Sequence, residues 1–178
     1  MEVVTAPNQI LRAKLKPVKK ITPELLKVAR EMIKLTKSFK DPEGVGLAAN
    51  QIGRNERFFV AKDIARKAPK DAFIICFNPK ILSVSPKTKV YFEGCLSIPN
   101  YYGETIRSLS IKAEYQDETG RKVVKRLSGT AAWIFQHEVG HLDGELFMDK
   151  VLQQKGRVYR VAGKDKAGAD ILEEVKVV

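Results

Sequence analysis

Histidine, cysteine and long apolar segments are all scarce in this sequence. Its 178 residues include two histidines, two cysteines and one tryptophan. So few cysteines make a disulfide framework implausible in a chain of this size and favour a reducing cytoplasm. No apolar run approaches the roughly 18 residues that a membrane-spanning helix needs. The first residues also lack the basic-then-apolar order of a secretory signal. We therefore expect a cytoplasmic protein without a membrane partner.

The charge balance is strongly basic, with 32 Lys and Arg against 21 Asp and Glu and a net charge of +11. Such an excess favours a polyanionic neighbour such as RNA or an RNA-rich particle, or it serves solubility alone. The length is enough for one hydrophobic core, and no repeat or linker marks a second unit. We expect a single domain over residues 1–178, with a basic and strand-like C-terminal extension over residues 151–178.

Both histidines fall within residues 136–141, which have the sequence QHEVGH. On a helix, side chains four residues apart lie on one face about 5–6 Å from each other, so His137 and His141 would reach a single metal ion. Glu138 would lie about 100° further round the helix, close enough to take a proton from a water molecule near the metal. The alternative is an amphipathic helix whose histidines only form local hydrogen bonds. The lack of any other histidine argues against that alternative.

A catalytic metal ion needs a third protein ligand and one open position. With no further histidine, the third ligand is Cys95 or a carboxylate. Cys95 follows a predicted strand and is bounded by Gly94 and Pro99. Cys76 lies within an apolar predicted strand, where a free cysteine usually behaves as a small buried hydrophobe. A thiolate with two imidazoles would suit zinc or ferrous iron.

Periodic segments predict an α+β fold. Thr22 and Pro23 indicate the start of an amphipathic helix that extends to about Phe39. A second helix is predicted from about Gly129 through the histidine motif, with Gly144 after its end. Strands are predicted at residues 57–61, 72–77, 81–84, 89–92, 110–115 and 122–127, and the last two form a hairpin. A mobile polar loop is predicted at residues 62–70, and a pair of strands at residues 157–162 and 171–177.

Three short segments occur in this order along the chain: residues 44–51 (GVGLAANQ), 93–97 (EGCLS) and 136–142 (QHEVGHL). Together they resemble the three signature motifs of the peptide deformylases. This resemblance implies mixed or antiparallel sheets packed around a central helix that carries the two histidines. It also implies a hydrolase that removes the N-formyl group from the initiator methionine of newly made polypeptides and releases formate.

The resemblance further implies a metal ion held by Cys95, His137 and His141. In this family the metal is natively ferrous iron, which zinc, nickel or cobalt replaces. Glu93 and Arg107 are then expected as a buried carboxylate–guanidinium pair that supports the metal ligands. The alternative for these two residues is an ordinary ion pair at the surface.

Catalytic and substrate contacts also follow from the resemblance. Glu138 resembles the general base that accepts a proton from water and later passes it to the leaving amine. Gln51 and the backbone N–H of Leu96 resemble the donors that hold the formyl oxygen as it gains charge. Substrate binding is implied for Gly46, through its backbone, and for the methionine-pocket residues Val45 and Ile134. The expected partners are N-formylmethionyl nascent peptides and, transiently, the ribosome, with no sequence-specific nucleic acid.

The chain departs from the family pattern at a few positions. Gly140 stands where the family usually has aspartate, which removes a potential partner for Arg107, and Asp143 is a candidate replacement. Tyr102 stands where many relatives carry a basic residue, and Ile106 where proline is common. We expect these changes to affect substrate preference and activity level, with the metal site retained.

Two other functions stay open on the sequence. One is a metallopeptidase with the same two histidines and a histidine or glutamate as third ligand. The other is a basic RNA-associated protein with a structural metal. A structural site needs four protein ligands, and only Cys76 could supply a second cysteine.

Overall fold

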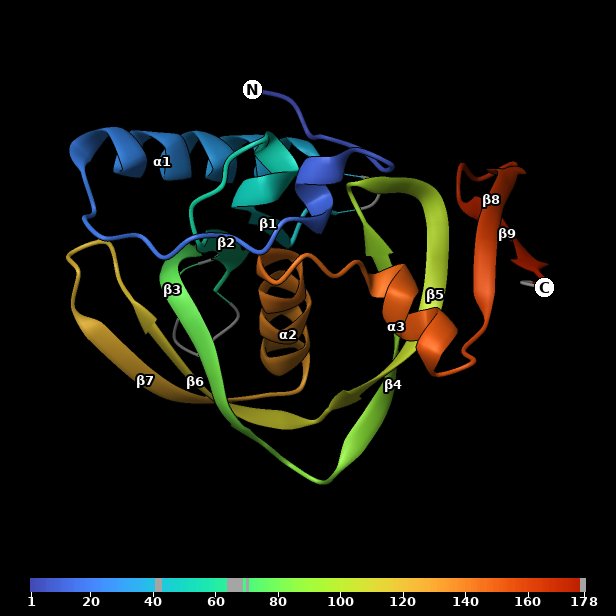
Figure 1. The fold of residues 1–178 in the computed structure, drawn as a ribbon. Helices are drawn as coiled ribbons and strands as arrows, with labels where there is room; N and C mark the ends of the chain where they lie inside the picture. The colour runs from blue at the N-terminus through green and yellow to red at the C-terminus, as the bar shows by residue number, and fades with distance from the viewer. Residues whose placement is uncertain (41–42, 64–68, 70, 177–178) are drawn as a thin grey trace.

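The computed structural model describes residues 1–40, 43–63, 69 and 71–176. Helix α2 (Thr130–Leu142) lies in the middle of the molecule, between a five-stranded and a four-stranded sheet (Figure 1). Neighbouring strands in both sheets run antiparallel. The predicted α+β fold is thereby confirmed. Within the described residues, no helix combines the length and apolar character that a membrane span requires.

Helix α1 (Pro23–Ser38) forms as the sequence predicts. The Thr22 hydroxyl accepts a hydrogen bond from the Leu25 N–H at 3.2 Å, and proline occupies the first helical position. Both features satisfy or remove N–H groups that would lack partners at a helix start. The buried face consists of Leu25, Ala29, Met32 and Thr36, and their helical spacing directs one stripe into the core.

The larger sheet has the order β1-β2-β3-β6-β7. Its strands are β1 (Gly46–Ala48), β2 (Phe58–Lys62), β3 (Phe73–Val84), β6 (Ser110–Gln116) and β7 (Lys122–Ser128). The predicted hairpin at residues 110–127 is confirmed as β6 and β7. Strand β2 supplies Phe58 and Phe59, whose rings pack against Phe77 of β3 and Phe135 of α2. This sheet and the two long helices therefore enclose the main core.

The separate strands predicted at residues 72–77 and 81–84 are wrong, because β3 runs continuously through both. Asn78 adopts a left-handed backbone with φ 50° at the point where the register with β6 shifts. Its side chain accepts a hydrogen bond from the Val18 N–H at 2.7 Å and donates one to the Val18 oxygen at 2.9 Å. These bonds stabilise a β-bulge at Asn78 and Pro79, so the strand continues beyond the proline. Most of the predicted loop at residues 62–70 lies outside the described residues.

The smaller sheet has the order β4-β5-β8-β9. Its strands are β4 (Thr88–Cys95), β5 (Ile98–Ser108), β8 (Val158–Lys164) and β9 (Asp170–Val175). The strand pair predicted in the C-terminal tail is confirmed as β8 and β9. Helix α3 (Phe147–Gln153) buries Phe147 and Val151 in a second apolar cluster with Cys95 and Val158. Neither α3 nor β5 was predicted.

Helix α2 contains Gly140 near its end, and this glycine is open to substitution. A Cβ built at Gly140 would meet only Glu145 atoms at 3.8 Å, which is ordinary van der Waals contact. Since glycine in a helix interior costs about 0.8–1 kcal/mol relative to alanine, we expect Gly140→Ala to raise the free energy of unfolding by up to about 1 kcal/mol. Urea denaturation at matched metal loading checks this.

The matched control for that variant is Gly144→Ala. Gly144 has φ 82°, and a Cβ there would lie 2.5 Å from the Arg12 carbonyl oxygen. We expect this substitution to destabilise the protein, because alanine rarely adopts a positive φ and the close backbone contact would have to open. A Gly140→Ala protein no more stable than the parent would contradict the expectation.

Candidate metal centre

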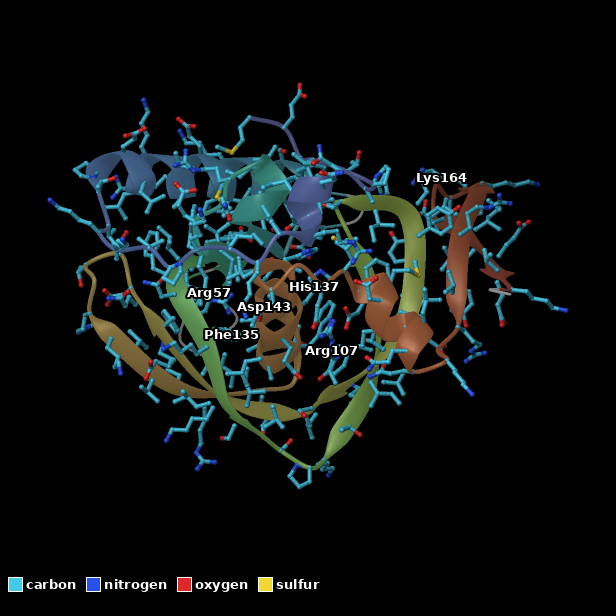
Figure 2. The ribbon with its side chains drawn as sticks, in the orientation of Figure 1. Arg57, Arg107, Phe135, His137, Asp143 and Lys164 are labelled. Carbon is cyan, nitrogen blue, oxygen red and sulfur yellow. The ribbon has the colours of Figure 1, made fainter. Side chains whose placement is uncertain are left out.

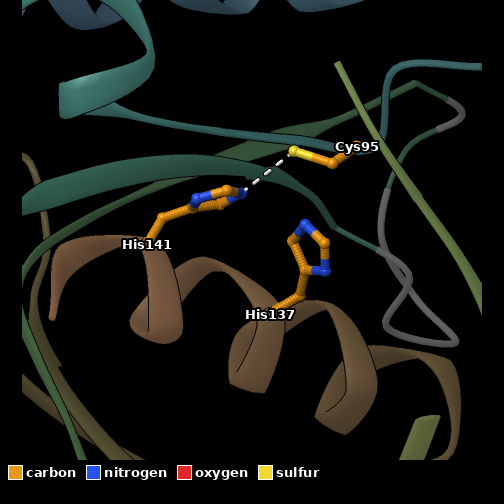
Figure 3. A group of neighbouring side chains, drawn as sticks. All are labelled: Cys95, His137 and His141. Atoms are coloured by element: carbon orange, nitrogen blue, oxygen red, sulfur yellow. Dashed lines mark hydrogen bonds between the residues drawn. The ribbon is translucent and has the colours of Figure 1, made fainter. Parts of the chain in front are cut away.

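Helix α2 and the end of β4 bring one cysteine and two histidines together (Figure 3). The potential ligand atoms of Cys95, His137 and His141 all lie within 4.8 Å of one another. The Cys95 Sγ atom is 3.2 Å from His141 Nε2. Cys95 and His141 are buried, and the side chain of His137 is 9% exposed. Two donors one helical turn apart and a third from a strand end thus face a common point.

Glu93, at the end of the same strand, orients His137. It is fully buried, and its Oε2 atom accepts a hydrogen bond from His137 Nδ1 at 2.8 Å. Arg107 donates to both carboxylate oxygens, from Nε at 2.7 Å and Nη2 at 2.8 Å, and the Thr105 hydroxyl donates to Oε1. Burial alone would raise the pKa of Glu93, but the bonds from Arg107 and His137 hold it well below its usual range. The ionised carboxylate therefore keeps the His137 proton on Nδ1 and leaves Nε2 available to a metal.

The expectation that Asp143 replaces the missing aspartate as a partner of Arg107 is wrong. Asp143 instead accepts a hydrogen bond from Arg57 Nη1 at 2.7 Å, and the two lie side by side in Figure 2. Asp143 caps the C-terminal end of α2, and its bond ties that end to the start of β2. The guanidinium of Arg107 is paired with the Glu93 carboxylate, so it does not need an aspartate at position 140 as a partner.

The electrostatics of the centre favour a cation. Burial by itself would raise the pKa of Cys95, but the positive charge of His141 and hydrogen bonds from both histidines lower it to about 5. Burial would lower the pKa of His137, but its bonds to Cys95 and Glu93 raise it to about 10. The cluster thus stabilises a thiolate next to positive charge. A divalent ion would take the place of the imidazole proton there, and one thiolate with two imidazoles is a ligand set that zinc and ferrous iron accept.

Glu138 lies beside the cluster as a buried and unpaired carboxylate. It is 3% exposed, and its Oε2 atom has no hydrogen-bond partner among the residues that the structure describes. Burial raises the pKa of Glu138 to about 7, although the two histidines act in the opposite direction. A Cβ at Gly46 would lie 2.3 Å from Glu138 Oε1, so only glycine leaves room for this carboxylate. A carboxylate with a pKa near neutrality is suited to accept and return a proton.

Gln51 points its amide at the cluster from helix η2 (Ala49–Ile52). Its Oε1 atom accepts a hydrogen bond from the Ala48 N–H at 2.8 Å, which leaves Nε2 as the inward donor. Nε2 donates to Ser97 Oγ at 3.0 Å and to Cys95 Sγ at 3.4 Å. Leu96 lies in the two-residue turn between β4 and β5, and its N–H bonds no acceptor in the described part of the chain. Both groups are donors at the edge of the centre.

A cavity of about 180 Å³ opens next to Glu138. Its lining includes Val45, Gly46 and Ile134, which were expected at the substrate site, and Tyr102, which was expected to affect substrate preference. It also includes Phe92 and Trp133, which were not expected there. Trp133 precedes His137 by one helical turn, and this spacing could have identified it. A larger cavity of about 640 Å³ is lined by Lys14, Arg57 and Asp143 among others, but by none of the three candidate metal ligands. The smaller cavity is therefore the one next to the reactive groups.

Comparisons with known proteins agree on one family. The family model described as polypeptide deformylase matches residues 1–157. A peptide deformylase of Thermotoga maritima is 40% identical over 153 residues, which are 86% of this chain and 88% of that protein. A peptide deformylase of Agrobacterium fabrum is 36% identical over the same shares of the two chains.

Solved structures give the same result. The crystal structure of peptide deformylase from Thermotoga maritima has a TM-score of 0.75 and 39% identity, covering 84% of this chain and 95% of that one. Peptide deformylase 1B of Arabidopsis thaliana, solved with an inhibitor, has a TM-score of 0.77 and 36% identity over 86% and 83% of the two chains. Sequence and fold thus agree: this chain belongs to the peptide deformylase family, whose metal-dependent enzymes remove the N-formyl group from newly made polypeptides.

Proposed function

We propose that Cys95, His137 and His141 hold one divalent metal ion, natively Fe²⁺, and that zinc, nickel or cobalt would occupy the same site. The observation that carries this proposal is the convergence of the three donors within 4.8 Å beside the unpaired Glu138 carboxylate. When bound, the ion acidifies a water molecule and polarises the formyl carbonyl group. The reaction site lies where these donors meet the cavity of about 180 Å³.

Glu138 moves the proton in this proposal. The water oxygen forms a bond to the formyl carbon, and the proton that it loses goes to the Glu138 carboxylate. The bond between the formyl carbon and the methionine nitrogen then breaks, and Glu138 returns the proton to that nitrogen. The products are a free amino terminus and formic acid, which releases its remaining proton to give formate. The pKa of Glu138, raised to about 7 by burial, suits both transfers.

Gln51 and Leu96 stabilise the developing negative charge. The Gln51 Nε2–H and the Leu96 N–H are positioned as donors to the formyl oxygen, and loss of one such donor typically costs about 100- to 1,000-fold in rate. Val45 and Ile134 form apolar walls for the methionine side chain, and the Gly46 backbone contacts the substrate peptide. A small, mostly apolar cavity with a few polar groups is typical of a site that recognises an apolar side chain.

Glu93 and Arg107 act on the ligands without touching the substrate. Glu93 accepts a hydrogen bond from the Nδ1–H of His137, and Arg107 neutralises the charge of Glu93. The metallopeptidase alternative needs a carboxylate or histidine ligand, yet Glu93 is fully engaged by four donors. The structural-metal alternative needs Cys76, which is fully buried within β3.

The proposal also includes the domain organisation, the cellular location and the partners of the protein. Residues 1–178 act as one catalytic domain, since β8 of the C-terminal extension pairs with β5. We place the enzyme in the cytoplasm, a setting that suits its free cysteines. A transient association with the ribosome would be favoured by the net charge of +11.

The direct test is formate release from formyl-Met-Ala-Ser by anaerobically purified protein. We expect turnover that falls to background after metal removal by a chelator and returns on addition of Fe²⁺, Ni²⁺ or Co²⁺, because the ion activates the water. Metal analysis of the same samples gives the stoichiometry. Undiminished turnover in protein shown to be free of metal would contradict the proposal.

A further inference from the structure

The hairpin of β8 and β9 lies beyond the end of the family match at residue 157. It extends the smaller sheet alongside β5 (Figure 1). Tyr159 of β8 is the direct cross-strand partner of Tyr102 of β5, which lines the cavity next to the metal centre. The hairpin is thus one strand away from the wall of that cavity.

Three aromatic rings connect the hairpin to the cavity. The Phe92 ring stacks on Tyr102, with centroids 5.2 Å apart and planes at 9°. Phe92 also lies 5.5 Å from Tyr159 at an angle of 56°. Gly94 pairs with Tyr102, and a Cβ at Gly94 would come within 2.7 Å of the Tyr102 ring, so this glycine allows the ring to lie over the strand. We call Phe92, Tyr102 and Tyr159 the aromatic shelf.

The shelf is held in place and partly exposed. The Tyr159 hydroxyl donates to Glu104 Oε1 at 3.2 Å, and Arg157 holds the same carboxylate with bonds of 3.1 and 2.9 Å. Phe92 is nevertheless 47% exposed. Rings that are already ordered lose little conformational entropy on binding, and large exposed apolar groups mark contact sites.

The shelf is continuous with the reaction site. Phe92 and Tyr102 line the same cavity as Cys95 and Glu138. An extended peptide advances about 3.3 Å per residue, so a chain whose first residue occupies this cavity places its next two residues within about 7 Å of that residue. Because the shelf adjoins this cavity, the residues of the substrate that directly follow the reacting residue are the ones that would contact the shelf.

We propose, resting on the proposed function, that the aromatic shelf binds the two residues after formylmethionine and favours large apolar or aromatic side chains there. Phe92 and Tyr102 contact the substrate. Tyr159 is a positioning residue, which braces Phe92 from the C-terminal hairpin. Contacts between aromatic groups of this kind correspond to about three- to tenfold in KM.

The test compares formyl-Met-Phe-Phe with formyl-Met-Ala-Ala. We expect kcat/KM to be about three- to tenfold higher for the first peptide, through KM, and the ratio to approach one in Phe92→Ser and Tyr159→Ala. Tyr159→Phe keeps the ring and should keep the preference. The matched control is Tyr101→Ala, which removes an exposed aromatic from the opposite face of the same strand, and it should leave both rates and their ratio unchanged.

Binding without turnover separates this proposal from the proposed function. Trp133, the single tryptophan of the chain, lines the cavity, so its fluorescence reports on binding of the unformylated peptides Met-Phe-Phe and Met-Ala-Ala. Tighter binding of Met-Phe-Phe that Phe92→Ser abolishes supports the shelf even where no formate is released. Equal kcat/KM and equal affinity for both peptides overturn the shelf and leave the proposed function standing. The shelf is also overturned if Phe92→Ser converts a dimer to a monomer without changing peptide selectivity, since the surface would then join two copies.

Discussion

Glu138→Gln is expected to abolish most formate release while the protein keeps its metal. The amide has nearly the same shape as the carboxylate, so it fits the space that Gly46 leaves, but it cannot accept a proton. A positioned general acid or base typically contributes about 100- to 10,000-fold, and the proposed mechanism uses Glu138 both to accept the proton and to return it. We therefore expect kcat/KM on formyl-Met-Ala-Ser to fall by at least about 100-fold. Steady-state kinetics and metal analysis of the same preparation measure the two quantities.

A nearby carboxylate provides the control for Glu138. Glu145 is exposed and lies just after α2, outside the cavity beside the metal centre. Glu145→Gln removes the same charge and should leave kcat/KM unchanged. If Glu138→Gln keeps full activity with its metal bound, the proton-transfer role belongs to another group.

Cys95→Ser is expected to lose the metal ion. A neutral hydroxyl is a far weaker ligand than the thiolate that the centre stabilises, as the lowered pKa of Cys95 indicates. Loss of an outer partner of a metal ligand already costs about 10- to 100-fold in affinity, and loss of a ligand should cost more. Competition with a chelator of known affinity, under anaerobic conditions, gives the metal affinity of each variant.

Two further variants test whether the loss of metal is specific to Cys95. Cys76→Ala removes the other free cysteine, which lies inside β3, and should retain one metal ion per chain. Glu93→Gln weakens the support of His137 and should reduce affinity by only about 10- to 100-fold. A Cys95→Ser protein that binds metal as tightly as the parent would point to a carboxylate as third ligand and revive the metallopeptidase alternative.

The sequence alone was sufficient for the elements whose patterns are local. The spacing of His137 and His141 depends only on helical geometry, and the structure places them on one face of α2. Thr22 and Pro23 indicated the start of α1 through capping, which involves neighbouring residues only. The choice between the two cysteines was also local, because an apolar strand surrounds Cys76 and a Gly- and Pro-bounded turn follows Cys95.

Features that depend on distant partners were missed. β5 contains Pro99, Asn100 and Gly103, which are poor strand formers, and it becomes a strand because β4 and β8 pair on either side. The continuity of β3 depends on the two hydrogen bonds between Asn78 and Val18, which lie 60 residues apart. The pattern of residues within one segment cannot predict hydrogen bonds to residues so distant in the sequence.

One short segment serves both sides of the reaction site, and this has a consequence for insertions and deletions. Within residues 46–51, Gly46 accommodates Glu138, Asn50 donates to the His141 carbonyl oxygen at 2.6 Å and Gln51 reaches Cys95. Adding or removing a single residue here would shift all three out of register at once. The turn between β6 and β7 supplies no residue to the reaction site described above. We therefore expect the chain to tolerate inserted residues, a tag or circular permutation there.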